Sequence, residues 1–271
     1  MSNQLKLMSL LLVFLPAIEG HANSDHQLSQ IELKALESFI EQDKQEFIKG
    51  TNETMHKADF IYANAISSAY EENEVAADLK YKNKRLYVKA TIKSINSGIN
   101  DEPFLSLEAD TPLTETRAYF KDSKQNLQTI AELRKGENIN LVCIGGSEML
   151  GSPSLKNCIT TKQYANEIDM TNTHKSFFLN YYAGEENQEN EDLRTADMET
   201  FALVLLVVTN LPEAQSICPS FRSKCSISEF IKLLKGCTVK GTGSCDEERK
   251  AVISKTYETI SQKIKLARNK H

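Results

Sequence analysis

The sequence predicts an α+β protein in which helical segments flank a five-stranded barrel. Apolar and polar side chains alternate along the first long extended run, from Arg85 to Ile95, which is the pattern of a half-buried strand. Four further extended segments follow, and a helical segment separates the third from the fourth. All six cysteines lie in the second half of the chain, four of them in a helical region near the C-terminus. These observations predict a barrel followed by a disulfide-stapled helical domain.

The N-terminus has the features of a secretory signal peptide. Lys6 precedes an apolar run from Leu7 to Ile18, and the small residues Gly20 and Ala22 stand at the −3 and −1 positions of a cleavage site. About 12 apolar residues are too few to span a hydrocarbon core of about 30 Å. The residue directly after the site is not a cysteine, so lipid attachment there is not expected. We expect cleavage of residues 1–22, a periplasmic location, and no stable membrane insertion.

Residues 23–72 are expected to form an N-terminal helical lead-in. Apolar residues between Gln27 and Lys49 recur close to the 3.6-residue period of an amphipathic helix. Gly50 ends this helix, and a second helix is expected from about Glu53 to Glu72. Both helices precede the first strand.

Residues 73–164 are expected to form the barrel. Leu86, Val88, Ala90 and Ile92 share one face of the first strand, which we take as the interior. The expected strands are Arg85–Ile95, Phe104–Ala109, Glu115–Phe120, Ile139–Ile144 and Ser154–Thr161. A helix from Ser123 to Lys135 is expected between the third and fourth strands. This order is that of an OB-fold, a partly open Greek-key barrel.

Four segments of this region carry a resemblance to a known family. They are AYEENEVAADLKYKNKRLYVKATIKSI, RAYF, LRKGENINLVCIGG and LGSPSLKNC. Together they resemble the exported bacterial OB-fold family called tRNA-anti-like, over about Ala63 to Cys158. The resemblance implies an OB barrel and a disulfide between Cys143 and Cys158. The family name reflects structural kinship with anticodon-binding domains and does not imply that its members bind tRNA.

The positions of Cys143 and Cys158 in the expected strands are compatible with the disulfide that the resemblance implies. Cys143 ends one strand, and Cys158 lies in the next. A bridge between them would close a loop of about 15 residues, which the chain-entropy model values at about 3 kcal/mol.

The C-terminal part of the chain is expected to be a linker followed by a helical domain. We place the linker at residues 165–192, because Glu185–Asp192 is acidic and lacks apolar residues. The helical domain takes residues 193–271. Its first helix, Thr195–Asn210, is apolar nearly all round, so other helices should cover it.

Two capping boxes predict the later helices of this domain. Ser226 with Glu229 opens one helix, and Ser244 with Glu247 opens the last. The four nearby cysteines follow the spacing C-x6-C-x11-C-x7-C, without a C-x-x-C pair, so disulfides are expected and a zinc site is not. They are Cys218, Cys225, Cys237 and Cys245, and the sequence leaves their three connectivities open.

A candidate ligand-binding face follows from the outward positions of the first three strands. Cations and aromatic rings alternate there, a combination suited to an anionic or planar ligand. The predicted ligand-binding residues are Arg85, Tyr87, Lys89, Phe104, Arg117 and Tyr119. The alternative is that these are ordinary solvent-side residues in cross-strand pairs. The formal charge of −5 argues against general polyanion binding but allows a local basic patch.

The sequence gives no support for catalysis. The histidines expected in the mature chain, His26, His56, His174 and His271, lie in predicted helix starts, linkers or the terminus. No nucleophile elbow or H-E-x-x-H motif is present. We therefore predict neither catalytic residues nor a metal or cofactor.

The sequence as a whole favours an exported non-enzymatic binding protein. Its OB-fold would recognise a protein, a peptide or another anionic ligand. One alternative is a module that binds single-stranded DNA or RNA, which we rank below a protein or peptide partner because nucleic acid is scarce in the periplasm. Another alternative is a periplasmic inhibitor or immunity protein, an analogy of class.

Overall fold

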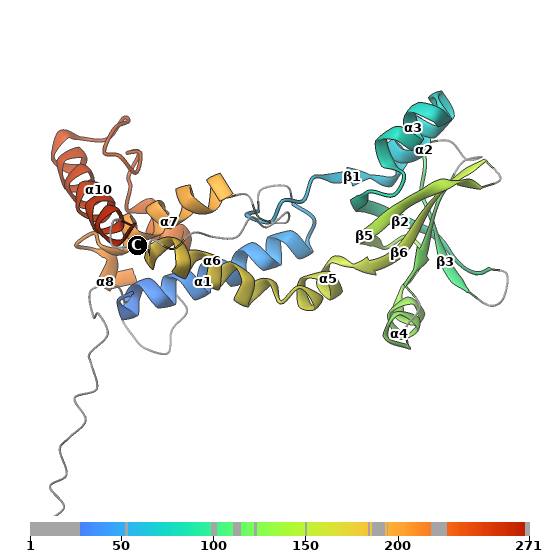
Figure 1. Ribbon diagram of the computed structural model, residues 1–271, viewed down its shortest axis with the longest axis horizontal. Coiled ribbons are helices and arrows are strands. Elements are labelled where there is room, and N and C mark those ends of the chain that lie inside the picture. Colours follow the sequence, from blue (N-terminus) through green and yellow to red (C-terminus); the bar gives the residue numbers. More distant parts are fainter. Residues whose placement is uncertain are drawn as a thin grey trace, which may run out of the picture.

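The computed structural model has the predicted α+β organisation. It describes residues 28–51, 54–98, 102–110, 115–121, 124–149, 151–183, 185, 193, 195–217 and 227–268. A barrel lies at one end of an elongated molecule and a helical body at the other, joined by α1, α5 and β1 (Figure 1). In these segments no helix combines the length and apolar character that a membrane crossing needs.

The barrel is a closed cylinder of five strands with the predicted OB-fold order. Its strands are β2 (Arg85–Ser97), β3 (Pro103–Leu107), β4 (Thr116–Phe120), β5 (Asn138–Met149) and β6 (Ser152–Thr160). Helix α4 (Lys124–Glu132) lies between β4 and β5 in the chain. Neighbours pair in the order β2, β3, β4, β6 and β5, and β5 pairs back onto β2 to close the cylinder.

Strand β2 holds the barrel together because it pairs with three other strands. Its first half, Arg85–Thr91, is antiparallel to β5, and its second half, Ile92–Ser97, is antiparallel to β3. The register shifts between Ile92 and Ser94, as expected of a β-bulge, which bends the strand from one partner to the other.

The predicted inward residues of β2 do form the barrel core. Leu86, Val88 and Ile92 are buried together with Leu105, Ala118 and Leu141 from the other strands, and Ala90 is partly buried against this cluster. The predicted disulfide between Cys143 and Cys158 is present and lies within this core. It joins neighbouring strands β5 and β6, so it constrains the closing edge of the cylinder.

The N-terminal segment differs from its prediction in one element. Helix α1 (Gln30–Ile48) forms as expected and opens with a capping box of Ser29 and Glu32. The second helix begins later than predicted, because the short strand β1 (Phe60–Tyr62) precedes α2 (Ala63–Glu72). β1 pairs in parallel with β2, and this tertiary pairing overrides the local helical pattern. Helix α3 (Glu74–Tyr81) then leads into β2.

Two helices that the sequence did not predict follow the barrel. They are α5 (Thr161–Glu167) and α6 (Met170–Ala183), and they occupy most of the segment expected to be a linker. Thr160 caps α5 through a hydrogen bond to its side chain from the backbone N–H of Gln163. Most of the acidic stretch at 185–192 lies outside the described residues.

The helical body combines the two ends of the chain. Its elements are α1, α6, α7 (Thr195–Thr209), α8 (Ala214–Ile217), α9 (Ile227–Lys232) and α10 (Glu247–Arg268). Leu36 of α1, Phe178 of α6, Leu206 of α7 and Ile253 of α10 are buried in one apolar cluster. The cover predicted for α7 is therefore supplied partly by the N-terminal helix.

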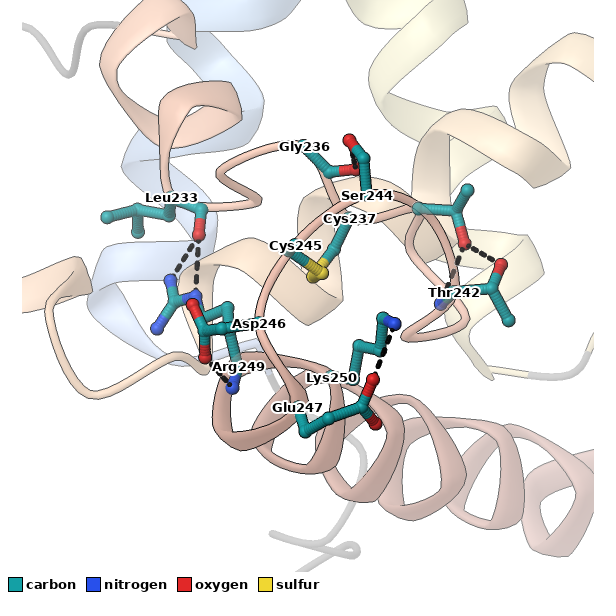
Figure 2. Close-up of a disulfide and its surroundings, with 11 residues drawn as sticks. Leu233, Gly236, Cys237, Thr242, Ser244, Cys245, Asp246, Glu247, Arg249 and Lys250 are labelled. Atoms are coloured by element: carbon teal, nitrogen blue, oxygen red, sulfur yellow. Dashed lines mark hydrogen bonds and ion pairs between the residues drawn. A yellow bond between two sulfur atoms is a disulfide. The ribbon is translucent and has the colours of Figure 1, made fainter.

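A disulfide staples the loop before α10. It joins Cys237 to Cys245, which is one of the pairings that the sequence left open. Cys218 and Cys225 lie outside the described residues. Figure 2 shows this bridge beside the start of α10. The capping box predicted at Ser244 is wrong: Asp246 caps the helix instead, accepting a 2.8 Å hydrogen bond from the backbone N–H of Arg249. Ser226, the other predicted cap, is also outside the described residues.

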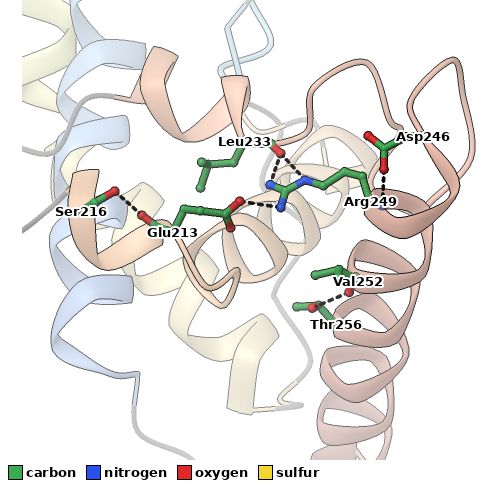
Figure 3. Close-up of polar contacts among 7 residues, drawn as sticks. All are labelled: Glu213, Ser216, Leu233, Asp246, Arg249, Val252 and Thr256. Carbon is green, nitrogen blue, oxygen red and sulfur yellow. Dashed lines mark hydrogen bonds and ion pairs between the residues drawn. The ribbon is translucent and has the colours of Figure 1, made fainter.

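Arg249 connects three parts of the helical body although its side chain is almost fully buried. Its guanidinium donates two hydrogen bonds to the backbone carbonyl of Leu233 and forms a 2.8 Å ion pair with Glu213 (Figure 3). Because the carbonyl of Leu233 receives its partner from α10, loss of Arg249 leaves a buried acceptor unpaired.

We expect Arg249→Ala to lower the free energy of unfolding by about 2 kcal/mol, measured by urea titration with circular dichroism. The matched control is Lys250→Ala, which removes only an ion pair with the exposed Glu247. This substitution should change the free energy of unfolding by less than about 0.5 kcal/mol. Equal effects of the two substitutions would contradict this role of Arg249.

Candidate ligand-binding face

The structure divides the six predicted ligand-binding residues into two groups. Phe104, Arg117 and Tyr119 lie together on the outer surface of β3 and β4. Arg85, Tyr87 and Lys89 lie on the first half of β2, whose partners are β5 and β1. The sequence therefore predicted one continuous face where the structure has two separate surfaces.

Tyr87 is buried, so the prediction that it faces solvent is wrong. It does lie on the face of β2 opposite the barrel core, but helices cover that face. The rings of Phe47 from α1, Phe60 from β1 and Tyr164 from α5 surround it at centroid distances of 6.0, 5.7 and 6.1 Å. Tyr87 is a packing residue between the barrel and the helices, and a ligand cannot reach it.

Arg85 and Lys89 lie on either side of this covered region. The guanidinium of Arg85 is 5.6 Å from the ring centre of Tyr164. The ammonium of Lys89 is 5.5 Å from the ring centre of Tyr62 and 6.0 Å from that of Phe60. Both cations thus lie on aromatic rings near the helix-covered face, away from the β3–β4 surface.

On β3 and β4, two aromatic rings form an accessible pair. Phe104 and Tyr119 are directly opposite each other in the strand register, and both are half-buried. Their ring centroids are 5.2 Å apart with an interplanar angle of 31°. The guanidinium of Arg117 lies 5.9 Å from the centre of the Phe104 ring. We call these three side chains, together with Lys93 and Glu115, the ring–cation patch.

Glu115 partly neutralises the two cations of the patch. Its carboxylate lies 3.2 Å from Nε of Arg117 and 3.5 Å from Nζ of Lys93, and it accepts a 3.0 Å hydrogen bond from Ser106. Burial opposes its ionisation, but these hydrogen bonds and positive charges together hold the pKa of Glu115 below its usual range. The patch therefore carries two cations and one anion at neutral pH.

This arrangement suits a ligand with a flat or apolar group and few negative charges. The ring pair offers a stacking surface, and the guanidinium beside it can pair with a carboxylate. A polyanion gains affinity from many phosphate contacts, whereas this patch supplies one excess positive charge.

Sequence reasoning missed a buried polar cluster between the barrel and the helices. It comprises Asp43 of α1, His56 of the segment before β1 and His174 of α6, all nearly inaccessible. Nδ1 of His174 faces Oδ2 of Asp43 across 3.5 Å, and Nε2 of His56 is 3.2 Å from the hydroxyl of Tyr87. The two imidazole centroids are 6.4 Å apart. No local pattern links these residues, since they come from distant parts of the sequence.

Burial governs the protonation of this cluster. It lowers the pKa of His56 to about 4, helped by the charge of Arg85, and lowers that of His174 to about 3. Burial also raises the pKa of Asp43 to about 6, although a hydrogen bond from the backbone of Met55 favours its charged form. In the described segments no three His, Cys, Asp or Glu residues form a group that could hold a metal ion.

The barrel, the strand order and the open outer surface of β3 and β4 define an OB-fold protein. The family model tRNA_anti-like matches residues 6–159, which is more than half of the chain. The chain belongs to this family.

Other comparisons add little to this assignment. A solved structure of a Klebsiella pneumoniae lipoprotein, described as a candidate nucleic acid-binding protein, is similar with 20% sequence identity and a TM-score of 0.31. The match covers 38% of this chain and 91% of that chain. No curated protein matches the sequence. At this TM-score the likeness carries no argument about what the present chain binds.

We expect the protein to lose stability as the pH falls from about 6.5 to about 4. The unfolded histidines take up protons near pH 6.5, whereas buried His56 and His174 stay neutral until about pH 4 or below. Asp43 acts in the opposite direction, because its folded pKa of about 6 lies above its unfolded value. Two groups outweigh one, so the net loss between pH 7 and pH 5 should be about 2 kcal/mol.

Urea titrations at pH 7, 6 and 5 measure this effect. His174→Leu removes one of the two histidine contributions and should make the loss clearly smaller. An unchanged slope in this variant, or a protein that gains stability on acidification, would contradict the assignment.

Proposed function

We propose that the protein is an exported, non-enzymatic binding protein that holds a protein or peptide segment on the ring–cation patch. The observation that carries this proposal is the accessible pair of Phe104 and Tyr119 with Arg117 beside it, on an OB barrel. The family and the fold support a binding module. The ligand class comes from the chemistry of the patch.

The charge of the patch favours a peptide over nucleic acid. Glu115 cancels one of the two cations, and the whole chain carries a formal charge of −5. A nucleic acid backbone would meet weak attraction here, whereas a peptide with one acidic and one aromatic or apolar side chain can use both the guanidinium and the rings.

Export is supported by two independent features. The N-terminus reads as a cleavable signal peptide, and the described cysteines are paired in two disulfides, which persist in oxidising compartments. We infer a periplasmic location from these features.

We expect Phe104→Ala and Arg117→Ala each to weaken peptide binding about tenfold. Peptides are selected by display on the purified mature protein, and their dissociation constants are then measured by fluorescence anisotropy. Lys162→Ala, an exposed change on α5, is the control and should leave the affinity unchanged. Selected peptides that bind all variants equally would refute the proposed face.

A labelled single-stranded oligonucleotide serves as the second ligand in the same assay. We expect no binding at physiological salt. Oligonucleotide binding that falls steeply with added salt and is lost in Arg117→Ala would instead support the nucleic-acid alternative.

A change in the patch charge gives a separate test. Glu115→Gln keeps the shape of the side chain and removes its negative charge, so Glu115 no longer offsets the charges of Arg117 and Lys93. We expect an acidic selected peptide to bind about two- to fivefold more tightly, with the gain reduced by salt. A weaker complex would show that Glu115 contacts the ligand or positions Arg117 for it.

A further inference from the structure

A second concave site lies beside the helix-covered part of the barrel. It is a cavity of about 410 Å³ formed where the end of α1, strand β1, the middle of β2 and the start of β5 meet. This volume lies in the range of small-molecule sites. None of the side chains of the ring–cation patch lines it, so it is a separate feature.

An accessible aromatic ring stands at this cavity. Tyr62 is 60% exposed, and it is the only aromatic residue among the exposed large apolar side chains of the described segments. It directly precedes α2 and is the last residue of β1, so the backbone on both sides of it is fixed. Lys89 places its ammonium 5.5 Å from the ring centre. A rigid, accessible ring is a ready surface for the flat face of a ligand.

The charged side chains that line the cavity are two cations and two anions. Lys49 and Lys89 contribute two positive charges, although Lys49 also pairs with Glu46 at 2.9 Å, and Glu108 and Asp110 contribute two negative charges. A polyanion would meet carboxylates as well as ammonium groups, and a purely apolar ligand would have to desolvate all four. The lining therefore favours a neutral ligand that both donates and accepts hydrogen bonds.

Two amide side chains add a donor and an acceptor. Asn138 accepts a 3.1 Å hydrogen bond from Thr91 through Oδ1, which leaves its amide nitrogen for a ligand. Asn140 donates a 3.0 Å hydrogen bond to the carbonyl of Ile48, which leaves its Oδ1 as an acceptor. These internal bonds also fix the orientation of both amides, so the site is largely preformed.

We infer that this cavity binds one ring of a neutral oligosaccharide. A sugar ring has an apolar face of C–H groups for Tyr62 and a rim of hydroxyls, each of which both donates and accepts hydrogen bonds. Asn138 and Lys89 would donate hydrogen bonds to the sugar hydroxyls. Asn140 and Glu108 would accept hydrogen bonds from them. The site does not depend on the peptide-binding role proposed for β3 and β4.

The test uses the mature full-length protein with three probes: cellotetraose, chitotetraose and maltotetraose. Binding is measured by saturation-transfer difference NMR and isothermal titration calorimetry. We expect at least one probe to bind, Tyr62→Ala to weaken it about tenfold, and Tyr62→Phe to retain it within about twofold. Because Tyr62 is exposed, circular dichroism should show both variants folded.

Tyr119→Ala is the matched control, since it removes an accessible tyrosine from the other surface. It should leave sugar binding unchanged and weaken peptide binding, which keeps the two proposals separately testable. The inference is overturned if no probe binds at about 10 mM, if Tyr62→Ala binds like the parent protein, or if Tyr119→Ala alone abolishes sugar binding.

Discussion

The packing of Phe47 and Tyr164 against Tyr87 determines which part of the barrel surface stays open. These rings bring α1 and α5 onto the outer side of β2, and Val142 and Ile159 of the neighbouring strands join the same buried cluster. Strand β2 is thus buried on both faces from Leu86 to Val88. The strand that closes the barrel also attaches it to the helical body.

The remaining accessible chemistry follows from this cover. Among the described residues no helix packs on the outer face of β3 and β4 in this way, and Phe104, Arg117 and Tyr119 remain partly exposed. The end of α1 and strand β1 build one wall of the cavity at Tyr62. The junction also encloses Asp43, His56 and His174, so the contact between the barrel and the helical body contains three groups whose charged forms are disfavoured by burial.

Local patterns predicted the barrel well, because the alternation of apolar and polar residues within each strand identifies its inward face. The alternation of Leu86, Val88 and Ile92 identified the inward face, and the placement of Cys143 and Cys158 on successive strands agreed with the pair found. The same alternation placed Tyr87 correctly on the outer face. A period of two residues tells which side a residue takes and cannot tell what covers that side.

Three of the missed features are products of long-range contact. The three residues of β1 read as part of a helix, and only their pairing with β2 makes them a strand. The bulge between Ile92 and Ser94 depends on the change of partner from β5 to β3. The approach of His56 to His174 requires α6 to return beside α1, which no spacing in the sequence encodes.

The central claim is that helices cover the outer face of β2 and leave that of β3 and β4 open. Hydroxyl-radical footprinting of the native protein, with mass spectrometric readout, tests this claim most directly because it compares aromatic side chains within one sample. The account predicts rapid oxidation of Phe104 and Tyr119 and protection of Tyr87 and Tyr164. Oxidation of Tyr87 as fast as that of Tyr119 would contradict it.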